Sequence, residues 1–151
     1  MSDPLSLEYL KGMLHTYGQL NMPDSNLWCI FDIQELEKSE NEIERFRELI
    51  FPSKKANIEL APIGDYNNFK TKILSHWLFS GDCWASRNLD SEWKEDKTNS
   101  FYHALATVTQ LKTIEQFIID GYSTDGFGVH STAFLITGFE KKYILYFIYD
   151  G

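Results

Sequence analysis

The sequence has few of the residues on which metal, redox and phosphate chemistry depend. Only two of its 151 residues are cysteine, too few for a disulfide framework or a structural zinc site. The four histidines are scattered along the chain. No phosphate loop, dinucleotide-binding glycine motif or His-Glu-x-x-His helix is present. We therefore expect no cofactor and no metal.

Two further deficits concern location and partner. The N-terminal sequence lacks the basic region and apolar run of a signal peptide, and no apolar stretch reaches the roughly 20 residues that a membrane-spanning helix needs. Basic residues are outnumbered, with 14 Lys and Arg against 22 Asp and Glu, a formal net charge of −8. Nucleic acids and anionic membranes both require a basic face. We expect a cytoplasmic protein that binds neither of them. A basic protein suits this charge as a partner, and the alternative is that the acidity serves only to keep the protein soluble.

Aromatic residues, by contrast, are abundant. They make up 15% of the chain, with 4 Trp, 8 Tyr and 11 Phe. One small core does not usually bury so many rings, so we expect some of them at a surface that contacts another molecule.

The densest apolar sequence, Val129 to Tyr149, predicts the centre of the fold. Two runs rich in β-branched and aromatic residues are separated by Gly138 to Lys142, a pattern typical of a β-hairpin. Both runs are nearly continuous rather than alternating, so we expect both faces of the hairpin to be covered, as in the middle of a sheet.

The chain length and the lack of a linker predict one domain over residues 1–151. Its expected class is α+β, with a mainly antiparallel sheet centred on the C-terminal hairpin and helices packed against it. Further strands are expected at 27–33 and at 57–63, the second at an edge because it contains Pro62. Helices are expected at 4–18, after a Ser39–Glu42 capping box, at 101–110 and at 114–119. Residues 69–78 favour a helix, with a strand as the alternative.

Residues 81–100 form the most polar region, and they combine carboxylates with two tryptophans. A small acidic domain of this kind, without a catalytic motif, resembles the immunity proteins of bacterial contact-dependent growth inhibition and polymorphic toxin systems. Asn88 to Trp93 is also similar to a segment of barstar, which binds a ribonuclease. The resemblance implies that the chain binds a cognate, basic, nuclease-type toxin domain and blocks its active site. The residues expected to contact the toxin are Asp82, Trp84, Asp90, Glu92, Trp93, Glu95 and Asp96.

A second interpretation is enzymatic. The segment Gly81–Ala85, followed by His130 and Asp150, resembles the order of nucleophile, base and orienting group in papain-like cysteine peptidases. The resemblance implies a cysteine hydrolase or acyltransferase in which Cys83 attacks as a thiolate, His130 holds its proton and Asp150 fixes the imidazole tautomer. Two features depart from that family, because 87–99 is too polar for the expected buried helix and no strand follows Asp150.

A third interpretation is a structural or regulatory subunit. In that case the surplus aromatic residues would line a permanent interface between subunits.

Overall fold

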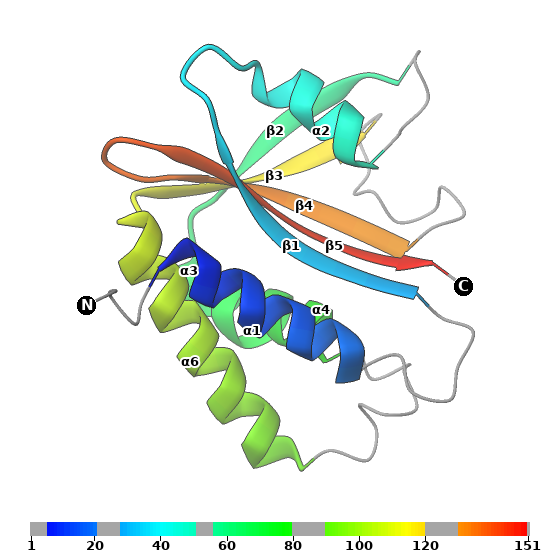
Figure 1. Cartoon of the computed structure of the whole chain (residues 1–151), viewed down its shortest axis with the longest axis vertical. Helices are drawn as coiled ribbons and strands as arrows, with labels where there is room; N and C mark the ends of the chain where they lie inside the picture. The colour runs from blue at the N-terminus through cyan, green and yellow to red at the C-terminus, as the bar shows by residue number, and fades with distance from the viewer. Residues whose placement is uncertain (1–5, 21–27, 51–55, 80–89, 120–129, 151) are drawn as a thin grey trace.

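The computed structural model describes residues 6–20, 28–50, 56–79, 90–119 and 130–150 (Figure 1). Five strands form one antiparallel sheet in the order β1-β5-β4-β3-β2. The strands are β1 (Trp28–Leu36), β2 (Ile58–Ile63), β3 (Thr113–Ile119), β4 (His130–Thr137) and β5 (Lys142–Asp150). The helices are α1 (Leu7–Leu20), α2 (Glu42–Ile50), α3 (Tyr66–Asn68), the π-helix η1 (Phe69–Leu74), α4 (Ser75–Leu78) and α6 (Ser91–Thr109).

The helices form two layers around the sheet. α1, α6 and the run α3–η1–α4 cover one face, and α2 covers part of the other (Figure 1). Each face therefore has its own hydrophobic cluster. On the α2 side, Phe46 stacks on Phe117 of β3 with ring centroids 4.5 Å apart. On the other side, Leu10 and Leu14 of α1 pack against the same cluster as Phe31 of β1.

The predicted α+β class and the central hairpin are confirmed. β4 and β5 occupy inner positions in the sheet, and successive side chains of β4 enter opposite clusters. Phe134 lies in the cluster beneath α1 and α6, whereas Leu135 lies in the cluster beneath α2. This explains why both runs are almost uninterrupted in apolar residues. β2, which contains Pro62, is an edge strand, as predicted.

Two predicted elements were wrong. Residues 87–99 were interpreted as polar and poorly helical, but 91–99 form the first half of α6. Residues 114–119, interpreted as helix, form most of β3. In the second case the spacing of Ile114, Phe117 and Ile118 fits a helix as well as a strand, and pairing with β2 and β4 decides the outcome.

Two predicted helix boundaries also differ. α1 continues past Gly18 to Leu20, and Gly18 instead allows the helix to approach β1, since a β-carbon there would lie 3.3 Å from the Cys29 carbonyl oxygen. α2 is capped by Asn41 rather than by Ser39. The Asn41 side-chain oxygen accepts hydrogen bonds from the backbone N–H groups of Ile43, at 2.9 Å, and of Glu44, at 3.1 Å.

α6 ends in a left-handed residue. Gln110 has φ 53° and ψ 52°. Among the residues that the structure describes, it is the one non-glycine residue with positive φ. Two residues later, the backbone N–H of Lys112 donates to the carbonyl of Thr137 at 2.8 Å. The end of α6 is therefore fixed to the end of β4, on the inner hairpin.

Candidate protein-binding site

The start of α6 carries most of the residues that were predicted to bind a partner. Asp90 is the N-cap of the helix, and its carboxylate accepts a hydrogen bond from the backbone N–H of Trp93 at 3.3 Å. Glu92 lies in the first helical turn, where negative charge is favoured by the helix dipole. These two acidic residues therefore have a structural role whether or not they bind a partner.

The predicted patch is exposed where the structure describes it. Asp90, Glu92, Glu95 and Asp96 are all exposed, and Trp93 is partly buried. Asp96 lies 3.9 Å from the amino group of Lys97. Within the described residues, neither Glu92 nor Glu95 forms an ion pair. The other two predicted contact residues, Asp82 and Trp84, lie outside the described residues.

Trp93 is held in place by the core. Its ring meets the buried Phe79 ring edge-on at 5.5 Å, and the amino group of Lys97 lies 5.8 Å from its centroid on another side. Trp93 also packs against the main hydrophobic cluster. A ring fixed in this way loses little conformational entropy on binding, which suits it to anchor a partner.

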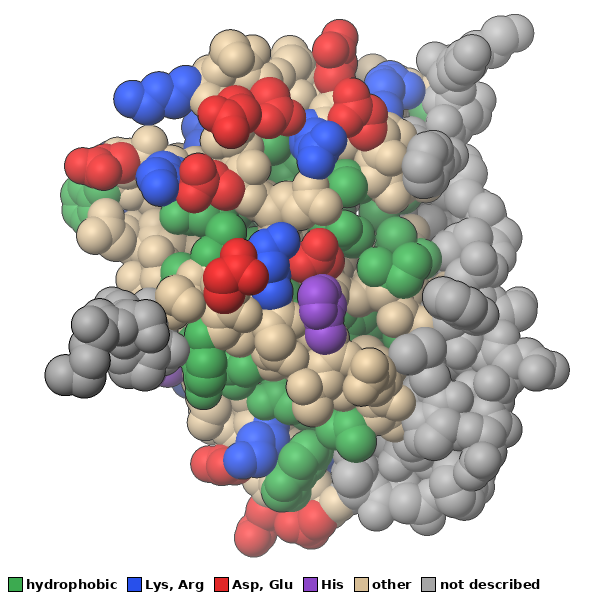
Figure 2. Space-filling model, in the orientation of Figure 1, with side chains coloured by type: hydrophobic (Ala, Val, Ile, Leu, Met, Phe, Trp, Pro, Cys, Tyr) green, Lys and Arg blue, Asp and Glu red, His purple; other side chains and the backbone are tan. Residues whose placement is uncertain are grey.

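Beside Trp93, a groove of about 620 Å³ runs between α1 and α6. It was not predicted from the sequence. In Figure 2, hydrophobic side chains are exposed over the lower part of this face and acidic side chains border them. Tyr9 is the most exposed ring of the groove, at 46%. The residues that line it are Tyr9, Gly12, Met13, Thr16, Tyr17, Leu20, Trp93, Lys97 and Ser100.

Charges of both signs lie at the groove, because Lys97 lines it and Asp96 lies next to Lys97. Burial raises the pKa of Tyr17, and the neighbouring Tyr9 and the carboxylate of Asp96 raise it further. The Tyr17 hydroxyl is therefore neutral at physiological pH. Asp96 of α6 thus lies close enough to Tyr17 of α1 to affect its pKa.

A second cavity, of about 550 Å³, lies between the β1–α2 connection and the β4–β5 turn. It contains many glutamates, but lysines offset them. Lys141 lies 3.2 Å from Glu35, and Lys142 lies 3.3 Å from Glu42. Figure 2 shows acidic and basic side chains interspersed over this upper part of the molecule. Such mutual neutralisation favours a structural role over attraction of a charged partner.

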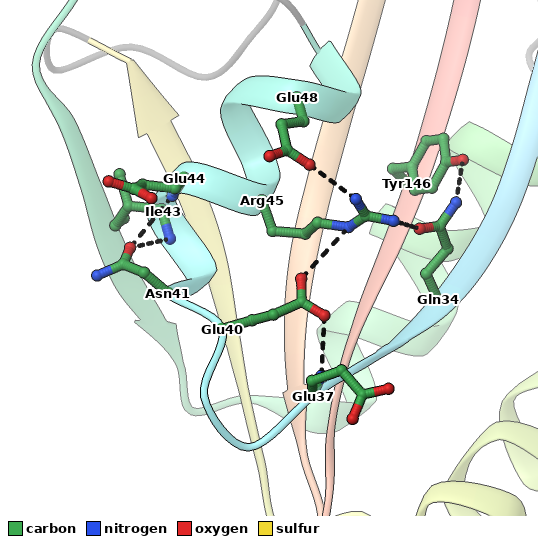
Figure 3. Close-up of polar contacts among 9 residues, drawn as sticks. All are labelled: Gln34, Glu37, Glu40, Asn41, Ile43, Glu44, Arg45, Glu48 and Tyr146. Atoms are coloured by element: carbon green, nitrogen blue, oxygen red, sulfur yellow. Dashed lines mark hydrogen bonds and ion pairs between the residues drawn. The ribbon is translucent and has the colours of Figure 1, made fainter.

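Arg45 of α2 is the centre of a polar network that was not predicted from the sequence (Figure 3). The Arg45 guanidinium donates to Glu48 at 2.7 Å and to the side-chain oxygen of Gln34, and it lies 3.7 Å from Glu40. Gln34 in turn donates to the Tyr146 hydroxyl at 3.3 Å. The network ties α2 to the neighbouring strands β1 and β5.

The network continues from Tyr146 to the edge of the sheet. The Tyr146 hydroxyl donates to Asp32 at 3.3 Å, and Lys11 and His15 of α1 each lie 3.5 Å from the same carboxylate. Burial, and then the Asp32 charge, raise the pKa of Tyr146 to about 12. In β1, polar Asp32 and Gln34 alternate with apolar residues. This alternation is the feature of the sequence that could have indicated a polar network on one face of β1.

The predicted catalytic triad can be followed only in part. His130 opens β4 opposite Tyr149, and Asp150 ends β5 opposite Trp28. The backbones of His130 and Asp150 therefore lie at the same end of two paired strands. Cys83 lies outside the described residues, and so do the side chains of His130 and Asp150. The triad stays a prediction.

Within the described residues, no group of three or more His, Cys, Asp and Glu side chains is arranged to hold a metal ion. None of the described helices combines the length and the apolar character needed to cross a membrane. No protein-family model matches the chain, and no curated protein matches its sequence. The fold defines an α+β protein, and inferences about its function depend on the surfaces described above.

Proposed function

We propose that this chain acts by binding another protein, and that it is an immunity protein which neutralises a basic, nuclease-type toxin domain. The observation that supports this most directly is the start of α6. There Glu92, Glu95 and Asp96 are exposed beside the fixed ring of Trp93. Carboxylates speed the encounter with a cationic partner, and a well-packed aromatic anchor slows dissociation.

Inhibition follows from the chemistry of the partner. A nuclease needs a basic cleft to bind the phosphate backbone of its substrate. An acidic surface that occupies this cleft takes the place of the phosphates and excludes the nucleic acid. The net charge of −8 extends the attraction beyond the contact itself, most strongly at low ionic strength.

The test is to add the protein to a panel of basic nuclease toxin domains and to measure residual nuclease activity and association rate. At least one toxin should be neutralised at a stoichiometric ratio. The triple variant Glu92→Lys, Glu95→Lys, Asp96→Lys should slow association about 10- to 100-fold and reduce its dependence on salt.

A matched control separates this patch from net charge. Glu37, Glu59 and Glu140 are exposed elsewhere on the molecule, and changing all three to lysine alters net charge by the same amount. This control should slow association far less than the α6 variant. Equal slowing by both variants would exclude the α6 patch, and neutralisation of no toxin in the panel would reject the immunity role.

A further inference from the structure

The groove between α1 and α6 is a candidate site for a third helix, because the residues that line it follow helical spacing. Its two walls are stripes at helical spacing that face each other: Tyr9, Met13 and Thr16 on α1, and Trp93, Lys97 and Ser100 on α6. Each stripe repeats at i, i+4 and i+7, which places its members on one side of a helix. A third helix can pack its side-chain ridges between two such stripes.

Gly12 gives the groove its depth. It lies in the interior of α1, where glycine weakens a helix, and it is exposed in the groove. A β-carbon placed on Gly12 would meet no atom within 4 Å. The space above Gly12 is therefore open, and a large side chain of a partner can enter it. Neither the packing of the core nor the close approach of another element explains a glycine at this position.

Charge identifies the kind of helix. Glu8 is exposed in the first turn of α1, next to Tyr9, and Glu92 and Asp96 are exposed on α6. Exposed carboxylates thus flank the groove on both helices, and Lys97, whose amino group lies against the Trp93 ring, is the one basic residue among those that line it. A second copy of this chain would bring the same carboxylates together, so like charges oppose a homodimer here. A helix with lysine or arginine beside its apolar face meets opposite charge instead.

We infer that this groove receives a basic amphipathic helix of the partner protein, with one large apolar side chain seated over Gly12. The inference rests on the proposed function for the nature of the partner, but it concerns one defined surface. It also gives Trp93 a specific role, as the α6 wall against which the apolar face of that helix packs.

The experiment uses two 18-residue peptides of equal composition. One is a helix-forming peptide with leucine and tryptophan on one face and lysine on the other, and the second is a scrambled version without an apolar face. Isothermal calorimetry measures binding of each to the full chain, and amide chemical shifts in NMR locate it. The amphipathic peptide should bind at least tenfold more tightly than the scrambled one, with shifts centred on α1 and α6.

Gly12→Leu is the decisive variant, because it adds a bulky side chain in the groove at a position where a β-carbon meets no atom within 4 Å. Its melting temperature should equal or exceed that of the parent chain, and it should bind the peptide at least tenfold more weakly. Tyr9→Ala, which removes an exposed ring, should also weaken binding. Gly64→Leu is the matched control, since Gly64 likewise has no atom within 4 Å of a β-carbon and lies outside the groove, and it should bind normally.

The inference would be overturned by equal binding of the two peptides, by unchanged binding of the peptide to Gly12→Leu, or by concentration-dependent self-association of the parent chain that Gly12→Leu abolishes. The last would mean that a second copy occupies the groove. The toxin assay distinguishes this failure from failure of the proposed function. If Gly12→Leu still neutralises a toxin that the parent chain neutralises, the groove inference fails and the immunity role stands. If no toxin is neutralised but the peptide binds in a way that depends on Gly12, the immunity role fails and the groove inference stands.

Discussion

Gly138 lies directly against the carbonyl group of Thr109. A β-carbon on Gly138 would be 1.9 Å from the Thr109 oxygen, far inside van der Waals contact, and that oxygen belongs to the backbone at the end of α6. Gly138 also closes the β4–β5 turn, because its N–H donates to the carbonyl of Lys141 at 2.9 Å. One glycine therefore allows the inner hairpin and the longest described helix to meet.

Gly138→Ala should destabilise the protein by about 1–3 kcal/mol, the usual range for forcing extra volume into a packed site. The backbone of α6 or of the turn must move to admit the methyl group. Urea denaturation followed by circular dichroism measures the change. Gly64→Ala is the control and should leave stability nearly unchanged, because the space around Gly64 is open. Equal stability of the two variants would contradict the close contact.

Gln110→Gly should stabilise the protein by about 0.5–1 kcal/mol, because glycine adopts the left-handed conformation at the end of α6 without steric cost. Gln110→Ala keeps a β-carbon and should bring no gain. Thermal unfolding of both variants beside the parent chain is sufficient. A gain in the alanine variant would show that the glutamine side chain, rather than its backbone, limits stability.

Asp90 allows the structural and binding roles of one acidic residue to be separated. Asp90→Ala removes the helix cap and should cost about 1 kcal/mol. Asp90→Ser keeps a capping oxygen but removes the charge, so it should retain most of the stability. If Asp90 also attracts the partner, Asp90→Ser should slow toxin association while melting near the parent temperature. Association at the parent rate would assign Asp90 to the helix alone.

The raised pKa of Tyr146 leads us to expect that the protein loses stability in alkaline solution. Its pKa is about 12 in the folded protein, because burial and Asp32 disfavour the phenolate, against 10 in the unfolded chain. The contribution of neutral Tyr146 to the free energy of unfolding is fully present below pH 10, and it is lost as the pH rises from 10 through 12. The loss is on the order of 2 kcal/mol.

Tyr146→Phe is the variant that tests this. It cannot ionise at this position, so its stability should fall less between pH 9.5 and pH 12 than that of the parent chain. Near pH 7 it should be the less stable protein, since Asp32 and Gln34 lose a partner. The pKa values of Tyr17, Tyr102 and Tyr143 are also raised, chiefly by burial, and they act alike in both proteins. Parallel curves of stability against pH would contradict the raised pKa of Tyr146.

Arg45→Ala should loosen α2. The substitution removes the donor that connects Glu48 and Gln34, and we expect a cost of about 1 kcal/mol because the guanidinium is partly exposed. Amide hydrogen exchange should accelerate in α2 more than in α6. Arg45→Lys retains the charge but not the planar fork of the guanidinium. The exchange rate of α2 in this variant should therefore lie between the rates in the parent chain and in Arg45→Ala. Exchange in α2 at the parent rate would show that the packing of Phe46 and the other contacts of α2 hold the helix without Arg45.

The apolar pattern predicted the inner hairpin of the sheet but assigned most of β3 to a helix. Val129–Tyr149 was recognised as a central hairpin because inner strands need apolar residues on both faces. The first half of α6 was missed because its exposed surface is so polar, although Asp90 three residues before Trp93 is a capping signal. The groove could not be predicted, because its walls come from helices far apart in the sequence. That Gly12 borders a cavity becomes visible only once α1 and α6 are placed side by side.

The register that pairs Trp28 with Asp150 has a consequence for biosynthesis. β1 is made early, yet its partner in the sheet, β5, is made after all the other described strands. Until β5 is made, the backbone N–H and C=O groups of β1 have no partner strand, and loop closure over all the described elements except α1 opposes the final pairing. We expect slow maturation on the ribosome and a transient need for chaperones, both of which pulse-labelling with limited proteolysis can follow.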